Sequence, residues 1–437
     1  MRLTILNQFF YPDHSATSQL MAELAQDLCE HGFEVTALAS RGRYNGGGGL
    51  PGREQYGGVR IERAWATSFG KSSLFGRLCD YLTFFLAAFW KLLTLPRQDV
   101  VMALTTPPLI GLIALIVGRL RGMRVVALME DLYPDVAIAL GAVKADGLLA
   151  RVFDGLTCLI LRRADRIIVL SDCMLERVVA KIGVDAYSRI DVIHNWADGQ
   201  EIAPLAAGEE RFFNQRDWPD LSDKFVVLFS GNLGLVNEFS TVLEAANRLR
   251  NHTNIAFVFI GAGARASEIR NYAFRHDLDN VRMLPYQPRE LLRHCLASGD
   301  VLLITLADGL AGLSMPSKTY SSLAAGRPLL FVGDQRSSVA HLIAQNECGV
   351  AVASGDSQLL AATLSAWAAN RAEPASLGVA SRALFERRFD RQVAVKGYLK
   401  SLTKCLQDAA IAAGNPLKDA APIQSVDTDV APPELGT

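Results

Sequence analysis

The sequence has no excess of charge of either sign. Lys and Arg together number 44 and Asp and Glu 45 in 437 residues, so the formal net charge is -1. Binding to nucleic acid through its phosphates depends on a basic surface. The balance excludes a nucleic-acid partner held by overall charge, and any anionic ligand must be held by a local group of residues.

The chain also lacks the patterns of a disulfide framework or a metal centre. Its seven cysteines form no C-x-x-C pair, and scattered thiols in odd number are typical of a reducing compartment. The seven histidines are dispersed, and no D-x-D stands convincingly at a strand end, so we expect no metal site. Residues 3–6 are too short for the apolar core of an export signal and indicate a strand.

No apolar run is suited to crossing a membrane. Residues 81–95 fall short of the roughly 20 residues that a span requires, and residues 100–118 are broken by Pro107 and Pro108. The second run divides better into a strand and a proline-started helix. Two interpretations stay open: core helices, or helices in the membrane interface, where aromatic and basic residues gather. The residues that favour the interface are Phe84, Phe85, Trp90, Lys71, Arg77, Lys91, Arg97, Arg119, Arg121 and Arg124.

What the sequence does contain is a regular alternation of strands and helices. An apolar strand at 3–7, a helix at 16–31 and a strand at 34–39 form a βαβ unit, which predicts a parallel sheet. Further strands are expected at 100–104, 125–129, 166–170 and 191–193. Six more begin at 225, 256, 281, 301, 328 and 350. We predict an α/β protein with two doubly wound, Rossmann-like domains that face a cleft.

Changes in composition place the expected boundaries. Residues 1–198 form the first domain, and the polar stretch 199–223 is the interdomain linker. Residues 224–380 form the second domain, and a helix at 381–407 packs back near the domain junction. Residues 408–437, rich in Ala, Pro, Asp and Gly, are expected to be disordered.

In doubly wound sheets, ligands bind at the carboxyl ends of the strands, which selects the loops to consider. In the first domain, Asp13 and His14 lie in the loop after the first strand, and Glu130 and Asp131 follow the strand at 125–129. A carboxylate such as Asp131 can orient an acceptor hydroxyl or take its proton. The alternative for each loop is simple helix capping. His194 starts a polar cluster that faces the cleft or only fixes the linker.

The second domain has three such loops. Gly231, Asn232 and Gly234 follow its first strand, and Arg265 ends a glycine-rich turn after the next. Glycines there allow a ligand to approach the backbone. The strongest candidate is the loop 308–320, where glycines precede a helix expected at 317–325. Its open N–H groups and a lysine predict a diphosphate site formed by Gly312, Pro316, Ser317 and Lys318.

Five motifs, in order, resemble a known family. They are L-T-I-L-N-Q-F-F-Y-P-D at the start, E-D-L-Y-P-D, H-N-W-A-D, G-N-L-G, and G-L-A-G-L-S-M-P-S-K-T-Y-S-S-L-A-A-G-R-P. Together they are similar to the bacterial family-four glycosyltransferases of GT-B fold, in the branch that builds capsule, O-antigen and colanic-acid-type polysaccharides. The resemblance covers residues 1–405.

The resemblance implies a retaining, metal-independent transfer from a nucleotide-sugar. The first domain would bind the acceptor, with Asp131, Asp13 and His14 facing the acceptor or the transferred sugar. The second would bind the donor, with the diphosphate near Lys318 and the base against Tyr286. Two departures stand out: many members carry two glutamates where this chain has Leu313 and Ser321, and an arginine and a lysine near Asn232. We therefore expect Lys318 and Arg265 to contribute more to donor binding.

The expected function is transfer of a sugar from a nucleotide-sugar to a lipid-linked or growing saccharide in bacterial surface polysaccharide biosynthesis. The protein would be cytoplasmic and peripherally associated with the inner membrane. It would need no cofactor beyond the UDP- or GDP-linked co-substrate, and no nucleic acid. Two alternatives remain: a catalytically silent scaffold of an assembly complex, suggested by the missing glutamates, and a UDP-sugar 2-epimerase-like enzyme.

Overall fold

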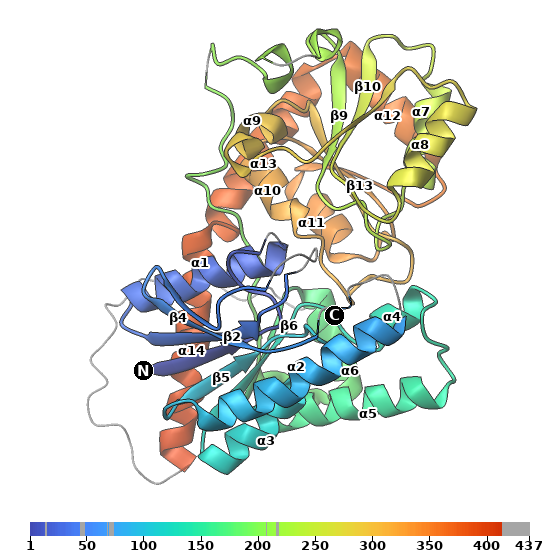
Figure 1. Ribbon diagram of the computed structural model, residues 1–437. Helices are drawn as coiled ribbons and strands as arrows, with labels where there is room; N and C mark the ends of the chain where they lie inside the picture. The colour runs from blue at the N-terminus through green and yellow to red at the C-terminus, as the bar shows by residue number, and fades with distance from the viewer. Residues whose placement is uncertain are drawn as a thin grey trace.

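The protein consists of two α/β domains stacked end to end (Figure 1). The computed structural model describes residues 1–13, 15–43, 49–67, 69, 74–206, 208–215 and 218–412. His14, most of the glycine run at 46–49 and the larger part of the predicted tail lie outside the described residues.

The first domain is built on an eight-stranded sheet in the order β3-β4-β2-β1-β5-β6-β7-β8. All neighbours are parallel except β3, which is antiparallel to β4. The strands are β1 Arg2–Leu6, β2 Glu34–Ser40, β3 Arg53–Tyr56, β4 Val59–Ala64, β5 Val100–Ala103, β6 Arg124–Met129, β7 Arg166–Val169 and β8 Ile190–Val192. The β3–β4 hairpin was absent from the sequence prediction; Gly57 and Gly58, both at positive φ, form its two-residue turn.

Helices cover both faces of this sheet. They are α1 Ala16–Glu30, α2 Leu74–Thr94, α3 Gly111–Arg121, α4 Asp135–Ala139, α5 Leu148–Arg163 and α6 Asp172–Ile182. Successive residues of β1 point to opposite sides: Ile5 packs in a core with α1, and Leu6 in one with α2 and α3. Ser15 and Ser171 start α1 and α6 by accepting backbone N–H bonds.

The second domain has a six-stranded, wholly parallel sheet in the order β11-β10-β9-β12-β13-β14. The strands are β9 Phe225–Ser230, β10 Ile255–Ile260, β11 Val281–Leu284, β12 Val301–Thr305, β13 Leu329–Val332 and β14 Gly349–Val352. The helices are α7 Ser240–Arg248, α8 Ala266–Arg275, α9 Leu292–Ala297, α10 Lys318–Ala324, α11 Ser338–Asn346, α12 Ser357–Ala369 and α13 Ala372–Arg388. The six strands and their order along the chain match the pattern read from the sequence.

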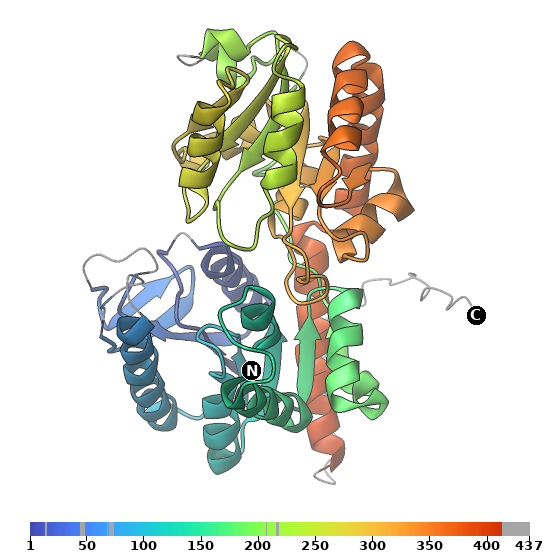
Figure 2. The same cartoon turned by 90° about the vertical axis from the view of Figure 1, so that its right-hand side faces the viewer.

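The connections between the domains differ from the prediction in two respects. The segment 199–223 is more than a polar linker, because Phe212 and Phe213 are fully buried in a core that both domains share. The single C-terminal helix predicted at 381–407 is two helices, α13 and α14 Arg391–Ala412, which meet at Phe389 and Asp390. Helix α14 packs against α1 and β6 of the first domain and continues past the predicted end at 407 (Figure 2).

Candidate functional site

The two sheets meet at the carboxyl ends of their strands. Asp131 follows β6 of the first domain and forms an isolated antiparallel bridge with Ser314, in the loop 308–317 of the second. The Leu132 N–H donates to the Leu313 carbonyl at 3.0 Å. A predicted acceptor-side acid and the predicted diphosphate loop are thus held together by backbone hydrogen bonds between domains.

Burial changes the acidity of the two adjacent acids. It raises the pKa of Glu130 from 4.5 to about 7, although the Asn195 side-chain amide donates to Glu130 Oε2 at 3.2 Å and opposes the shift. Burial also raises the pKa of Asp131, against a hydrogen bond from Ser314. A carboxyl group with a raised pKa accepts a proton more readily, which is the property that a general base requires.

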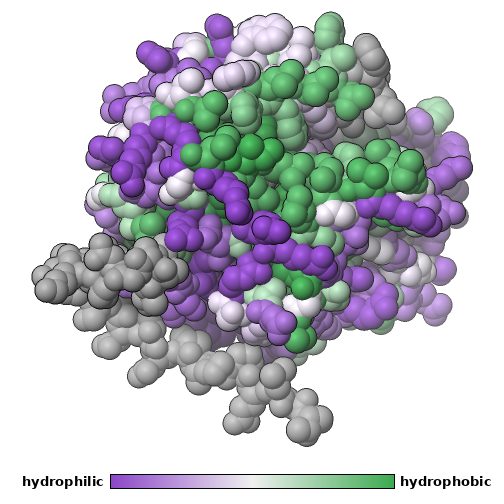
Figure 3. Space-filling view, turned by 90° about the horizontal axis from the view of Figure 1, so that it is seen from below, coloured by the Kyte–Doolittle hydropathy of each residue, from purple (hydrophilic) through white to green (hydrophobic). Residues whose placement is uncertain are grey.

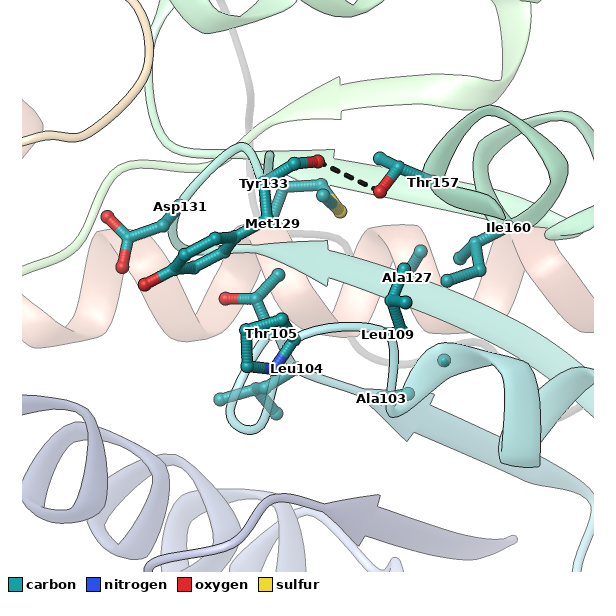
Figure 4. A pocket seen from close by; sticks show the side chains of 12 residues that line it. Ala103, Leu104, Thr105, Leu109, Ala127, Met129, Asp131, Tyr133, Thr157 and Ile160 are labelled. Carbon is teal, nitrogen blue, oxygen red and sulfur yellow. Dashed lines mark hydrogen bonds between the residues drawn. The ribbon is translucent and has the colours of Figure 1, made fainter. Parts of the chain in front are cut away.

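A pocket lies beside Asp131 at the ends of β5 and β6. Figure 4 shows Asp131 and Tyr133 at one end of it and apolar side chains such as Ile160 and Leu109 at the other. Thr157 Oγ donates to the Tyr133 carbonyl at 2.8 Å and so fixes this turn to α5. The Thr105 hydroxyl, also on the pocket wall, is buried and has no hydrogen-bond partner among the residues that the structure describes. The pocket therefore combines apolar walls with a carboxylate and a hydroxyl.

Lys318 is a half-buried cation that forms no ion pair with a described residue. Its ammonium lies 4.6 Å from the centre of the Phe229 ring, and no carboxylate of the described residues pairs with it. Burial alone lowers its pKa from 10.5 to about 8. An uncompensated buried charge is costly and is retained where an anion is to be bound, so Lys318 fits a phosphate-binding role.

The glycine loops after β9 and β10 pack backbone against backbone next to this lysine. Gly231, Gly261 and Gly263 have φ of 130°, 143° and 156°. A β-carbon on Gly261 would lie 2.0 Å from the Gly231 carbonyl oxygen, and one on Gly263 would lie 2.4 Å from the Leu233 carbonyl oxygen. Only glycine fits at these positions, and the result is a surface of exposed backbone beside Lys318.

The other predicted donor residues occupy varied settings. The backbone carbonyl of Asn232 accepts a hydrogen bond from the Asn237 side-chain amide. Gly234 lies beside the Asn232 side chain. Tyr286 is exposed and donates to the Ala262 carbonyl, so it lies near the glycine loops. Arg265, predicted to lie near the phosphates, forms an ion pair with Glu268 at 3.0 Å.

The helix after the diphosphate loop is shorter than predicted. It begins at Lys318, after Pro316 and Ser317, and the Ser317 side chain makes no capping bond. Ser321, one turn on, donates to the Lys318 carbonyl at 3.1 Å, so its hydroxyl serves the helix itself. Of the predicted residues of this loop, Lys318 has the clearest chemical reason to contact an anion.

Gly312 faces the first domain. Its φ is 73°, and a β-carbon there would lie 2.8 Å from the Cys173 carbonyl oxygen in α6.

Asp13 lies in the loop after β1, where its N–H donates to the Phe10 carbonyl. Ser314 was not selected from the sequence, although it stands in the G-L-S-M-P motif. Within the described part of the chain, no group of three or more His, Cys, Asp or Glu side chains could hold a metal ion.

The fold and this arrangement define a class: two facing parallel-sheet domains with a cation and glycine loops opposite an acid. Models of two protein families match the chain, a Glycosyl transferase 4-like domain over residues 16–196 and Glycosyl transferases group 1 over residues 210–383. The protein belongs to the glycosyltransferases of GT-B fold, in the group whose relatives serve bacterial polysaccharide biosynthesis.

Two bacterial relatives agree with this assignment. The chain is 27% identical to the probable glycosyltransferase WbjE of Pseudomonas aeruginosa over 315 residues, or 72% of this chain and 77% of the relative. It is 29% identical to the putative colanic acid biosynthesis glycosyl transferase WcaI of Escherichia coli over 214 residues, 48% and 51% of the two chains.

Solved structures show the same fold. Sucrose-phosphate synthase from Thermosynechococcus elongatus superposes with a TM-score of 0.74 at 16% identity, covering 94% of this chain and 100% of that one. The Anabaena protein HepE in complex with UDP and glucose gives 0.70 at 14% identity, covering 92% and 100%.

Proposed function

We propose that the protein is a retaining, metal-independent glycosyltransferase that moves a sugar from a UDP-sugar to a lipid-linked or growing saccharide in bacterial surface polysaccharide biosynthesis. Residues 224–380 bind the donor and residues 1–198 the acceptor. The observation that carries the proposal is the unpaired Lys318 ammonium on the domain that faces Asp131 across the junction.

The donor diphosphate contacts Lys318 and the backbone of Gly231 and its neighbouring loop. A fixed ammonium neutralises charge on the departing diphosphate, the task that a divalent cation performs in a metal-dependent enzyme. This supports metal independence. UDP is favoured because HepE was solved with UDP and UDP-glucose, and the E. coli trehalose-6-phosphate structure with UDP-2-fluoro glucose. Retention of configuration rests on the family resemblance.

An acceptor hydroxyl lies beside Asp131, which orients or deprotonates it. Burial of Asp131 supports this role because it raises the carboxylate's affinity for a proton. A lipid-linked acceptor places the protein at the inner face of the cytoplasmic membrane. Relatives named for colanic acid and amylovoran biosynthesis favour a polysaccharide intermediate as acceptor.

The test uses the purified full chain with UDP-, GDP- and dTDP-sugars and membrane extract as acceptor source. We expect nucleotide release that depends on both a UDP-sugar and the extract, persists in EDTA, and gives a product with the donor's anomeric configuration. Binding of UDP without turnover on any acceptor would favour the silent scaffold. Conversion of the UDP-sugar without acceptor would favour the epimerase. Neither UDP binding nor turnover would overturn the proposal.

A further inference from the structure

Helix α2 has an exposed apolar stripe. Leu78, Leu82, Leu86 and Trp90 follow one another at intervals of four residues, and each is between 58% and 63% exposed. Phe84, on the other side of the helix, is fully buried against the sheet. A helix that packs on a core with one face normally presents polar residues on the other. Helix α2 is therefore apolar on both sides: one side belongs to the core, and the other is an apolar surface that the described residues leave exposed.

The stripe continues onto the next two helices of the same layer. Helix α3 packs against both α2 and α5. The exposed large apolar residues of these two helices are Ile116, Leu120, Leu148, Leu149, Val152 and Leu159. We call the exposed apolar residues of the three helices the α2–α3–α5 face. Figure 3 shows the end of the molecule away from the second domain, with a broad hydrophobic area bordered and crossed by hydrophilic side chains. A patch of this extent marks an interaction site.

Basic side chains surround this face. They are exposed and make no ion pair with any described residue: Arg97, Arg119, Lys144, Arg151, Arg162 and Arg163. Two acids of the same helices are engaged, Asp80 by the Phe69 N–H and Asp154 by Lys181. Asp146, before α5, is exposed. The net charge at the rim of the face is therefore positive, in a protein whose overall charge is close to zero.

We propose that the α2–α3–α5 face docks on an anionic lipid bilayer, with the three helices lying in the interface. Apolar side chains that insert among the lipids, with arginines at headgroup level, are the recognised arrangement for such helices. No helix of the described residues is long and apolar enough to cross a membrane. A second copy of the chain is a poorer occupant, because a twofold contact would bring the same basic rim against itself.

The face and the pocket beside Asp131 share two helices. Gly111, the first residue of α3, lines the pocket, and so do Thr157 and Ile160 of α5. Docking would thus bring a lipid-linked acceptor dissolved in the bilayer to helices that also supply part of the pocket wall. This last step rests on the proposed function, whereas the docking itself does not.

The experiment measures co-sedimentation of the full chain with vesicles of phosphatidylcholine, with and without phosphatidylglycerol. We expect binding that requires phosphatidylglycerol and falls with added salt. Leu82→Gln with Leu86→Gln should weaken it by about tenfold or more, since both side chains would lose their insertion into lipid. Arg162→Glu with Arg163→Glu should remove the dependence on anionic lipid. The matched control is Phe274→Gln, which changes a residue 85% exposed on α8 of the other domain and should bind as the native chain does.

Thermal unfolding and UDP binding of each variant in the absence of vesicles show whether it is folded. They also separate the two proposals, because UDP binding tests the donor site alone. No binding of the native chain to anionic vesicles would overturn the docking proposal, and so would equal binding by the Leu82/Leu86 variant. A dimer in light scattering that this variant dissociates, without vesicle binding, would assign the face to a second copy instead.

Discussion

The side chain of Lys318 crosses the backbone of Gly231 so closely that a β-carbon on the glycine would lie 2.6 Å from Lys318 Cε and 3.3 Å from Nζ. Gly231 has a φ of 130°, which favours glycine, and a side chain there would have to displace the lysine. The loop after β9 and the start of α10 therefore form one site, and the lysine charge is directed to the place where backbone is exposed.

Replacement of Lys318 by methionine should separate binding from stability. We expect the affinity for UDP to fall by about 5- to 150-fold, because a charge-assisted hydrogen bond of about 1 to 3 kcal/mol is lost. The free energy of unfolding should rise, since a half-buried cation that forms no ion pair with a described residue is removed and the apolar stem is kept. Calorimetric titration with UDP and urea unfolding measure the two quantities. Unchanged UDP affinity would show that the diphosphate lies elsewhere.

Donor binding should weaken as the pH rises through about 8. Burial lowers the pKa of Lys318 to about 8, so above that pH the free protein carries a neutral amine. A bound diphosphate favours the ammonium and raises its pKa, so binding takes up a proton at alkaline pH. The dissociation constant of UDP, measured across this range, should increase in the native chain. In Lys318→Arg, where the guanidinium stays charged, the same measurement should give a flat profile if UDP still binds.

The sequence predicted those features that depend on local pattern. Apolar runs identified all six strands of the second sheet, and the motif around Lys318 stood out because glycine, proline and lysine precede a helix. Features that depend on contacts between distant segments were not visible. The role of Ser314 depends on its meeting Asp131 from the other domain, which no local pattern encodes.

Gly312 and Gly309 offer a matched pair for testing the contact between domains. Both have positive φ, so alanine costs about 1 to 2 kcal/mol of strain at either position. At Gly312 the new methyl would also meet the Cys173 carbonyl at 2.8 Å, whereas at Gly309 the nearest atom is Ala139 Cβ at 3.7 Å. We expect Gly312→Ala to lower the free energy of unfolding by a further 1 to 3 kcal/mol or so, from overpacking against α6. If both alanine variants lose the same free energy of unfolding in urea, the loop at Gly312 shifts away from α6 without cost.

Asp131→Asn should abolish most transfer while leaving the donor site intact. An amide is nearly isosteric but accepts no proton, so we expect kcat to fall by about 10²- to 10⁴-fold with the affinity for UDP unchanged. Ser314→Ala is the companion variant. Its hydroxyl lowers the pKa of Asp131, so its removal should raise that pKa further and move the acidic limb of the pH–rate profile to higher pH. If kcat of Asp131→Asn equals that of the native chain, another group takes the proton of the acceptor hydroxyl.

Glu130 should make the stability of the protein depend on pH in a direction opposite to that of a paired carboxylate. Its pKa is raised by burial from 4.5 to about 7, so the folded protein holds a proton that the unfolded chain has released. The contribution of Glu130 to the free energy of unfolding is therefore greatest below pH 4.5. It is lost as the pH rises from 4.5 to about 7, and it changes no further above that pH. Glu130→Gln keeps the hydrogen-bonding shape without the charge. In urea unfolding across this range, the variant should lose less stability than the native chain as the pH rises. Parallel profiles would show that Glu130 is solvated enough to ionise freely in the fold.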